Sequence, residues 1–166
     1  SLGISAAYFD ITQENRVSDG NTPGGVEQTG AVIDGWELQV NKRWQRFETQ
    51  LAYTDLNARD DASGNRLPYV AERQASWWNQ LYIANNWRVG AGVRYVGDNV
   101  GSGGGPVVPS VTLYDAMIGY TWQNWDFTVD AKNLADDEYI TWCRSEGADC
   151  GYGERRTVNA NAKYRF

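Results

Sequence analysis

The chain has 166 residues and a net charge of −6, with 42% hydrophobic residues, 18 Gly, 10 Tyr and 8 Trp. The aromatic content argues against a disordered chain, and the acidic balance argues against a nucleic-acid-binding surface. No run approaches the roughly 18 apolar residues of a membrane-spanning helix. Many aromatic and glycine residues with moderate hydrophobicity predict an all-β protein with many turns.

Alternation of apolar and polar residues is the dominant pattern along the chain. Successive side chains of a strand point to opposite faces, so residues 158–166 place apolar side chains on one face and polar side chains on the other. The period is less clear near residues 2–12 and at the adjacent Trp77 and Trp78. The pattern predicts about eight antiparallel strands, near residues 2–13, 28–42, 46–58, 72–84, 87–98, 110–121, 125–135 and 155–166.

The predicted connections alternate in length. Short ones lie around residues 42–45, 84–86 and 122–124, and long ones cover about 14–27, 59–71, 99–109 and 136–154. Short periplasmic turns and long extracellular loops are typical of outer-membrane barrels. The fold class predicted from this layout is a transmembrane antiparallel β-barrel segment, with both termini on the periplasmic side.

Tryptophan placement favours the same orientation. Trp44, Trp87, Trp122 and Trp125 lie at or beside the short turns, as in half of an interfacial girdle, where the indole ring stays in apolar surroundings and its N–H stays wet. The alternative is a soluble sandwich or lipocalin-type barrel with its apolar faces turned inward. Charges on the polar face of most strands would be costly in such a core, so the membrane interpretation is preferred.

Four segments of the second half occur in a characteristic order and spacing: residues 88–98, 108–116, 132–139 and 143–166. Together they resemble TonB-dependent outer-membrane receptors, in particular ferric-siderophore receptors of the hydroxamate, or ferrichrome-like, group. The resemblance covers at least residues 87–166, and residues 28–38 resemble the preceding strands of the family.

The resemblance implies a plugged barrel of about 22 strands, of which residues 1–166 would be the C-terminal part, with the plug domain absent. The expected function is part of a receptor for ferric-siderophore uptake in the outer membrane of a Gram-negative bacterium. The chain would form barrel wall and extracellular ligand-side loops, with the ferric siderophore as transported ligand of the full receptor and no covalently bound cofactor. Expected partners are outer-membrane lipid, the rest of the receptor, the outer-membrane assembly machinery and, through the missing N-terminal part only, the TonB complex.

A stand-alone or engineered eight-stranded outer-membrane barrel with a structural role is the alternative. Eight strands can close, because side chains just fill the interior of such a barrel. Closure would bring together the charged residues Glu37, Glu48, Arg88, Arg94, Asp126, Asp130, Lys132 and Lys163. Pairing with other receptor strands is therefore preferred. An enzyme is not expected, since a chain without His has no Ser-His-Asp site.

The two cysteines lie in the long connection between the last two strands. In an extracellular loop they predict a Cys143–Cys150 disulfide, and a metal site is not expected. The resemblance implies a ligand-side aromatic residue after the first cysteine, where this chain has Arg144, with Trp142 just before the disulfide. Arg144 would favour an anionic siderophore through a charge-assisted hydrogen bond. The alternative is that Arg144 is a solvated charge and Trp142 a girdle residue.

Four further features are weaker candidates. Tyr139 and Tyr152 are either siderophore-side residues or girdle and loop packing. The acidic residues 136–138 suggest calcium or, more simply, a solvated strand end, and residues 101–106 suggest a flexible loop tip. Tyr164 and the C-terminal Phe166 share the apolar face of the last strand, and an aromatic residue there resembles the signal read by the outer-membrane assembly machinery.

Overall fold

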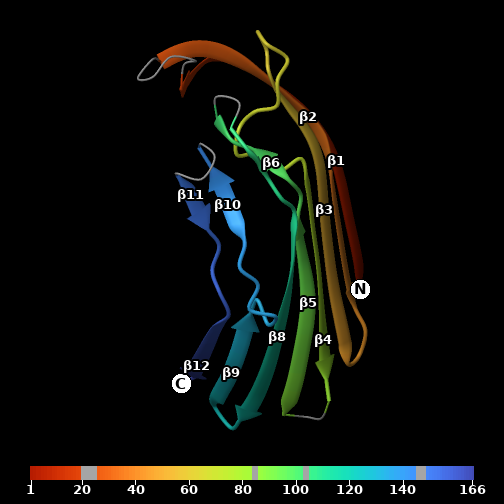
Figure 1. Ribbon diagram of the computed structural model, residues 1–166. Coiled ribbons are helices and arrows are strands. Elements are labelled where there is room, and N and C mark those ends of the chain that lie inside the picture. Colours follow the sequence, from red (N-terminus) through yellow and green to blue (C-terminus); the bar gives the residue numbers. More distant parts are fainter. Residues whose placement is uncertain (20–25, 84–85, 103–104, 145–148) are drawn as a thin grey trace.

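The computed structural model describes residues 1–19, 26–83, 86–102, 105–144 and 149–166. Eight strands form one antiparallel sheet in the order β1-β2-β3-β4-β5-β8-β9-β12. They are β1 (Leu2–Asp19), β2 (Val26–Arg43), β3 (Phe47–Asp60), β4 (Arg73–Tyr82), β5 (Trp87–Val96), β8 (Val111–Trp122), β9 (Trp125–Lys132) and β12 (Thr157–Tyr164). The sheet bends into a deep arc (Figure 1). The predicted all-β class and the eight strands are confirmed.

The arc is open. In the described residues β1 pairs with β2, β12 pairs with β9, and no ladder joins β1 to β12 (Figure 1). The chain therefore does not adopt the closed eight-stranded barrel that the stand-alone alternative requires. Both edges keep unpaired backbone N–H and C=O groups, which a membrane protein must pair with further strands.

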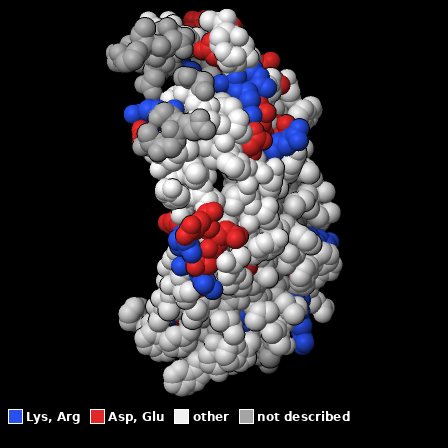
Figure 2. Space-filling view, in the orientation of Figure 1, with Lys and Arg blue, Asp and Glu red and all other residues white. Residues whose placement is uncertain are grey.

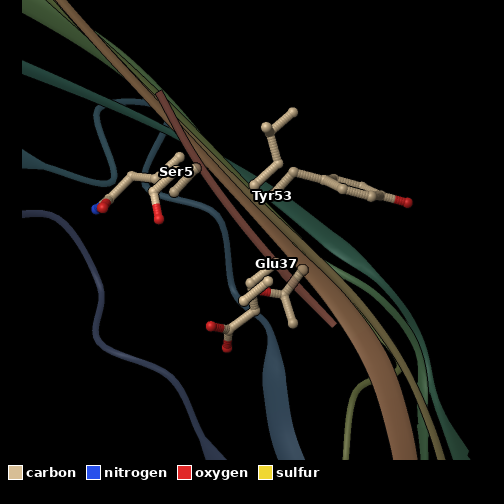
Figure 3. A pocket seen from close by; sticks show the side chains of 8 residues that line it. Ser5, Glu37 and Tyr53 are labelled. Carbon is tan, nitrogen blue, oxygen red and sulfur yellow. The ribbon is translucent and has the colours of Figure 1, made fainter. Parts of the chain in front are cut away.

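Strand register separates the side chains into two faces. One row across neighbouring strands contains Ile4, Val40, Leu51, Trp77, Val93 and Tyr114. These apolar side chains lie on the outer face of the arc, where many large hydrophobic residues are exposed. Figure 3 shows the two directions at a shallow hollow on β1–β3: Ser5 and Glu37 point to one side of the sheet and Tyr53 to the other. The apolar face is thus on the outside, as predicted for a membrane barrel and opposite to a soluble one.

The predicted connection at residues 14–27 was wrong. β1 extends to Asp19 and β2 begins at Val26, so most of this segment is strand. The register shifts between Gln13 and Arg16, and Asn15 has a φ of 54°. Such a bulge resets the alternation of side chains, and the strict period of two used for the prediction breaks there.

Two long connections contain small hairpins that the sequence pattern missed. β6 (Asn99–Val100) pairs with β7 (Val107–Val108), and β10 (Ile140–Cys143) pairs with β11 (Cys150–Tyr152). The short turns predicted at residues 42–45 and 122–124 are present, whereas residues 84–85 of the third turn lie outside the described residues. In the part of the chain that is described, no helix is long and apolar enough to cross a membrane.

The adjacent tryptophans of β4 lie on opposite faces. Trp77 is exposed on the outer face, and Trp78 lies on the inner face over β5. A Cβ added at Gly92 would lie 2.5 Å from Cε3 of Trp78, and one at Gly90 would also clash with the indole. Glycine at these two positions therefore provides the space in which the Trp78 ring lies flat on β5.

The connection after β3 packs onto the inner face of the sheet. Leu67 is buried against Ala31 and Ala58, and Ile33, Leu56 and Val70 surround this small core. The Leu67 N–H donates to the carbonyl of Ala58 at 3.0 Å. Burial of these side chains holds residues 61–72 over the inside of the arc, where they support the other loops.

Candidate functional site

The outer wall carries two rows of aromatic side chains. The first lies at the short turns, where Trp87 contacts Tyr120 with ring centroids 4.5 Å apart and Trp125 contacts Tyr164 at 5.0 Å. The second includes Tyr53 and Tyr95, which lie in one cross-strand row through Ala75; Tyr95 is on the face of Trp87 and eight residues further along β5. Eight residues span about 26 Å along a strand, or roughly 20 Å after tilt, close to the apolar band of about 25 Å in outer-membrane barrels.

The remaining predicted girdle residues are in the first row. Trp44 lies 5.3 Å from Phe47, centroid to centroid, and Trp122 is opposite Trp125 at the turn between β8 and β9. Both Trp44 and Trp122 are exposed. The predicted tryptophan row is therefore present as one aromatic border of the apolar face.

Charged side chains of the inner wall form ion pairs between strands, from β5 to the adjacent β8 and across β8 to β9. Arg88 donates to the two carboxylate oxygens of Asp126 at 2.9 and 2.6 Å, with Thr128 also accepting from Arg88 at 2.8 Å. Arg94 makes a similar bidentate contact with Asp115. Such forked pairs are geometrically specific. They make the inner face polar without leaving these charges uncompensated.

The acidic segment after β9 forms an ion-pair cluster. Asp136 accepts from Nε and Nη2 of Arg155 at 3.0 and 2.8 Å and from the backbone N–H of Arg156 at 2.9 Å, and Glu138 also pairs with Arg155. Figure 2 shows acidic and basic side chains gathered at the level where β9 ends. No group of three potential metal-binding side chains occurs among the described residues. Asp136 and Glu138 thus serve as partners of an arginine.

Asn133 holds the acidic segment after β9 in place through hydrogen bonds. Its side chain is buried and donates to the carbonyls of Asp137 and Glu154 at 2.9 and 3.1 Å, and its N–H donates to Asp115. The residue has a φ of 51°, a conformation that Asn adopts more readily than most residues. It belongs to the motif at residues 132–139, although its role was not predicted.

We expect the Asp136 cluster to persist in mild acid. Arg155, with the N–H of Arg156, holds the pKa of Asp136 well below its ordinary value of 3.8. A lowered pKa in the folded state stabilises the protein above the unfolded pKa, and this contribution is lost as pH falls through the folded pKa. The protection factor of the Arg156 amide in hydrogen exchange should therefore stay constant from pH 7 to pH 4 and fall only below that range.

Asp136→Asn should lower this protection factor throughout the same pH range and remove the fall in acid. Asp137→Asn is the matched control, because Asp137 makes no ion pair within the described part of the chain. Equal protection of the Arg156 amide in wild type and Asp136→Asn at pH 7 would contradict the prediction.

Three connections meet on the loop side of the arc and form what we call the loop layer: residues 61–72, 99–108 and 140–152, as far as they are described. The first and second join through a 2.8 Å hydrogen bond from the Tyr69 N–H to the carbonyl of Val100. The second and third join through Asn99, whose Nδ2 donates to the carbonyl of Thr141 at 3.1 Å. The loop layer is therefore one connected unit.

The predicted disulfide is present and closes the β10–β11 hairpin. Cys143 and Cys150 are joined at 2.00 Å, and Cys143 is only 4% exposed. A Cβ at Gly101 would clash with the carbonyl oxygen of Cys143, so the disulfide end of the hairpin lies directly against the β6–β7 segment. Residues 103–104 of the predicted loop tip lie outside the described residues.

The four residues predicted on the ligand side have different surroundings in the structure. The Trp142 ring lies over Gly151 and is nearly perpendicular to the Tyr69 ring, with centroids 6.1 Å apart. Arg144 faces Asp149, with Nη1 and Oδ2 3.4 Å apart. The Tyr139 ring lies against Gly153, and Tyr152 is 75% exposed. Of the four, the Trp142 ring contacts the loop of residues 61–72, and Arg144 lies against Gly105 of the second loop through its backbone carbonyl oxygen.

The sequence pattern did not predict a role for Tyr69. Its hydroxyl is 2.8 Å from Oγ of Ser102, and its ring meets Trp142. It follows Leu67 and Pro68 in a segment without periodicity, so no pattern marks it. The apolar residues Leu67 and Val70, within a predicted loop, are the one local sign that this segment packs against the sheet.

Comparison with known proteins identifies the family. The family described as TonB dependent receptor-like, beta-barrel, matches residues 1–134. The catecholate siderophore receptor Fiu of Escherichia coli strain K12 is 32% identical over 180 residues, covering 99% of this chain and 24% of that protein. The ferrioxamine receptor of Yersinia enterocolitica is 29% identical, covering 98% of this chain and 25% of that receptor.

The architecture agrees with this result. The crystal structure of Fiu in its closed form has a TM-score of 0.80 at 27% identity, covering 99% of this chain and 25% of that one. The chain thus spans about a quarter of the length of the curated relatives named here. With its outer apolar wall, inner ion pairs and loop layer, the chain belongs to the TonB-dependent receptor family and represents part of its β-barrel.

Proposed function

We propose that the chain forms part of the barrel wall and the ligand-side loops of an outer-membrane receptor for ferric-siderophore uptake in a Gram-negative bacterium. The observation that carries the proposal is the open eight-stranded arc, apolar outside and polar inside, with a connected loop layer at one end. The named relatives are siderophore receptors, which supports transport rather than an enzymatic role.

The proposal also names the partners. The free edges of β1 and β12 would pair with the remaining strands of the receptor, and the apolar outer face would contact outer-membrane lipid. The polar inner face would line the lumen around a plug domain. Coupling to the TonB complex would depend on the N-terminal part of the receptor, and insertion on the outer-membrane assembly machinery.

For the ligand we propose a ferric siderophore of low net charge, of the hydroxamate class. Arg66 and Arg144 are the two basic side chains in the described part of the loop layer, and each pairs with carboxylates: Arg66 with Glu72 and Asp98, Arg144 with Asp149. Arg66 holds the pKa of Asp98 below its usual value, so that pair stays charged and compensated. A surface with paired cations and exposed aromatic rings suits a neutral chelate better than an anionic one.

The relatives do not choose between ligand classes, since one is a catecholate receptor and the other a ferrioxamine receptor. Growth promotion is therefore the test, using the full-length receptor in a strain lacking its own siderophore receptors. We expect growth with ferrichrome, a neutral ferric trihydroxamate, and much less with an anionic ferric tris-catecholate. Growth with neither complex overturns the proposed function, and a preference for the tris-catecholate overturns the ligand class.

Charge variants of the hairpin sharpen this test. Because Asp149 compensates Arg144, Arg144→Phe should leave the preference for ferrichrome unchanged. Asp149→Asn should release the Arg144 charge and raise affinity for the tris-catecholate several-fold, measured as Kd on the purified receptor. A large shift of preference with Arg144→Phe would instead make Arg144 a direct ligand contact.

A further inference from the structure

Tyr69 is held in place by the loops around it. Its N–H donates to Val100 and its hydroxyl is hydrogen-bonded to Ser102, both at 2.8 Å. Two residues earlier, Leu67 is buried on the sheet. These contacts hold both ends of the Tyr69 side chain, at the backbone and at the hydroxyl, so the direction of the ring is determined.

The backbone of Tyr69 is strained. Its φ of 66° lies in the left-handed region, which is unfavourable for a bulky residue and persists only where surrounding contacts enforce it. Such strain is concentrated at functional sites. In the loop layer it places the Tyr69 ring beside Trp142, whose own loop is 73 positions further along the chain.

The position of the Trp142 ring is also fixed, by contacts within the β10–β11 hairpin. The absence of a side chain at Gly151 allows the indole to lie on β11, and the disulfide at the next residue closes the hairpin. The Tyr69 and Trp142 rings meet edge to face at an interplanar angle of 82°, a favourable aromatic arrangement. The pair is a preorganised corner built from two loops.

Within this part of the barrel, the corner is open to solvent. Tyr69 is 40% exposed and Trp142 is 37% exposed, although other apolar side chains of the loop layer, such as Leu67 and Val108, are buried. Two aromatic rings held by strain, hydrogen bonds and a disulfide, yet left partly uncovered, provide a rigid apolar surface at low entropic cost for a ligand.

We propose that Tyr69 and Trp142 together contact the apolar rim of the ferric siderophore and set its tolerated size. The inference rests on the proposed function and adds Tyr69 to the ligand-side residues. The rings would pack on the hydrocarbon around the hydroxamate groups, and the Ser102 contact would keep the Tyr69 hydroxyl away from the ligand. The pair thus selects for apolar shape, independently of charge.

The test uses the full-length receptor and measures Kd for ferrichrome and for an analogue with larger hydroxamate acyl groups. Tyr69→Asn removes the ring and keeps a residue that tolerates positive φ, and Trp142→Ala removes the second ring. We expect each to weaken ferrichrome binding at least fivefold and to reduce discrimination between the two chelates. The double variant should weaken binding by less than the product of the two single-variant effects, because substitutions of residues in contact are not independent.

Tyr69→Phe keeps the ring but loses the Ser102 hydrogen bond, and should bind within about twofold of wild type. Tyr114→Phe, on the outer face, is the control and should leave Kd unchanged. Heat-modifiable migration in detergent checks that each variant is folded; if Tyr69→Asn fails this check, Trp142→Ala carries the test.

Three results distinguish failure of the proposed function from failure of the proposed aromatic contact. A wild-type receptor that binds no ferric siderophore overturns the proposed function itself. If wild type binds but Trp142→Ala and Tyr69→Asn bind equally well, the aromatic corner is not a ligand contact. If Tyr69→Phe is as weak as Tyr69→Asn, the hydroxyl bond that positions the loops is the cause, and the contact is again overturned.

Discussion

Replacing Phe166 with serine should reduce the amount of assembled receptor in the outer membrane at least tenfold. Phe166 is fully exposed on the outer face and meets Tyr164 edge to face at 5.1 Å, and Tyr164 in turn contacts Trp125 at 5.0 Å. Apart from its contact with Tyr164, the exposed Phe166 ring contributes little to the packing of the arc. We therefore propose that it is a contact for the outer-membrane assembly machinery.

The measurement is the heat-modifiable, membrane-inserted fraction of the full-length receptor at equal expression. Phe166→Tyr is the matched control, because it keeps an aromatic ring at this position, and it should assemble like wild type. Tyr164→Ser should cause a smaller loss, since it disturbs the aromatic row while leaving the Phe166 ring in place. Normal assembly of Phe166→Ser would rule out Phe166 as a recognition signal.

Replacing both cysteines with serine should open the β10–β11 hairpin and weaken ferrichrome binding about tenfold. A disulfide that closes a loop of this size stabilises it by roughly 2–3 kcal/mol in the chain-entropy account. The disulfide is next to Trp142 and packs against Gly101. Its loss should therefore release both the indole and the contact with the β6–β7 segment.

Hydrogen exchange at the Arg144 amide follows this opening directly, because that N–H donates to the carbonyl of Asp149 at 2.8 Å inside the hairpin. Protection there should fall strongly in the double variant, and protection in β8 and β9 should be unchanged. Wild-type receptor treated with a reductant is the control and should reproduce the binding loss. Unaltered exchange and affinity would mean that backbone pairing of the hairpin is sufficient.

Most strands were predictable because alternation is a local property. A residue's face follows from its position within the strand, so β5, β8 and β12 began and ended within a few residues of the prediction. The alternation breaks at Asn15, because the bulge between Gln13 and Arg16 adds a residue to β1. β10 and β11 were not predicted, because strands of four and three residues are too short to show a period.

The candidate site was predictable only in part. The disulfide followed from two cysteines in a predicted extracellular loop, and Trp142 from its position beside them. The role of Arg144 did not follow, because a sequence does not show that Asp149 lies across the hairpin and compensates its charge. Tyr69 could not be found either, because its partners Ser102 and Trp142 are distant in sequence.

The amino-acid sequence by itself determined the fold class, the number of main strands, the apolar face and the resemblance to siderophore receptors, since each depends on neighbouring residues or on motif order. Only the tertiary structure decided that the sheet stays open, that the β3–β4 loop packs on its inner face and that Tyr69 meets Trp142. These outcomes depend on side-chain volume, ion pairing and hydrogen bonds between segments far apart in the chain. Such contacts form only when the curved sheet brings the loops together.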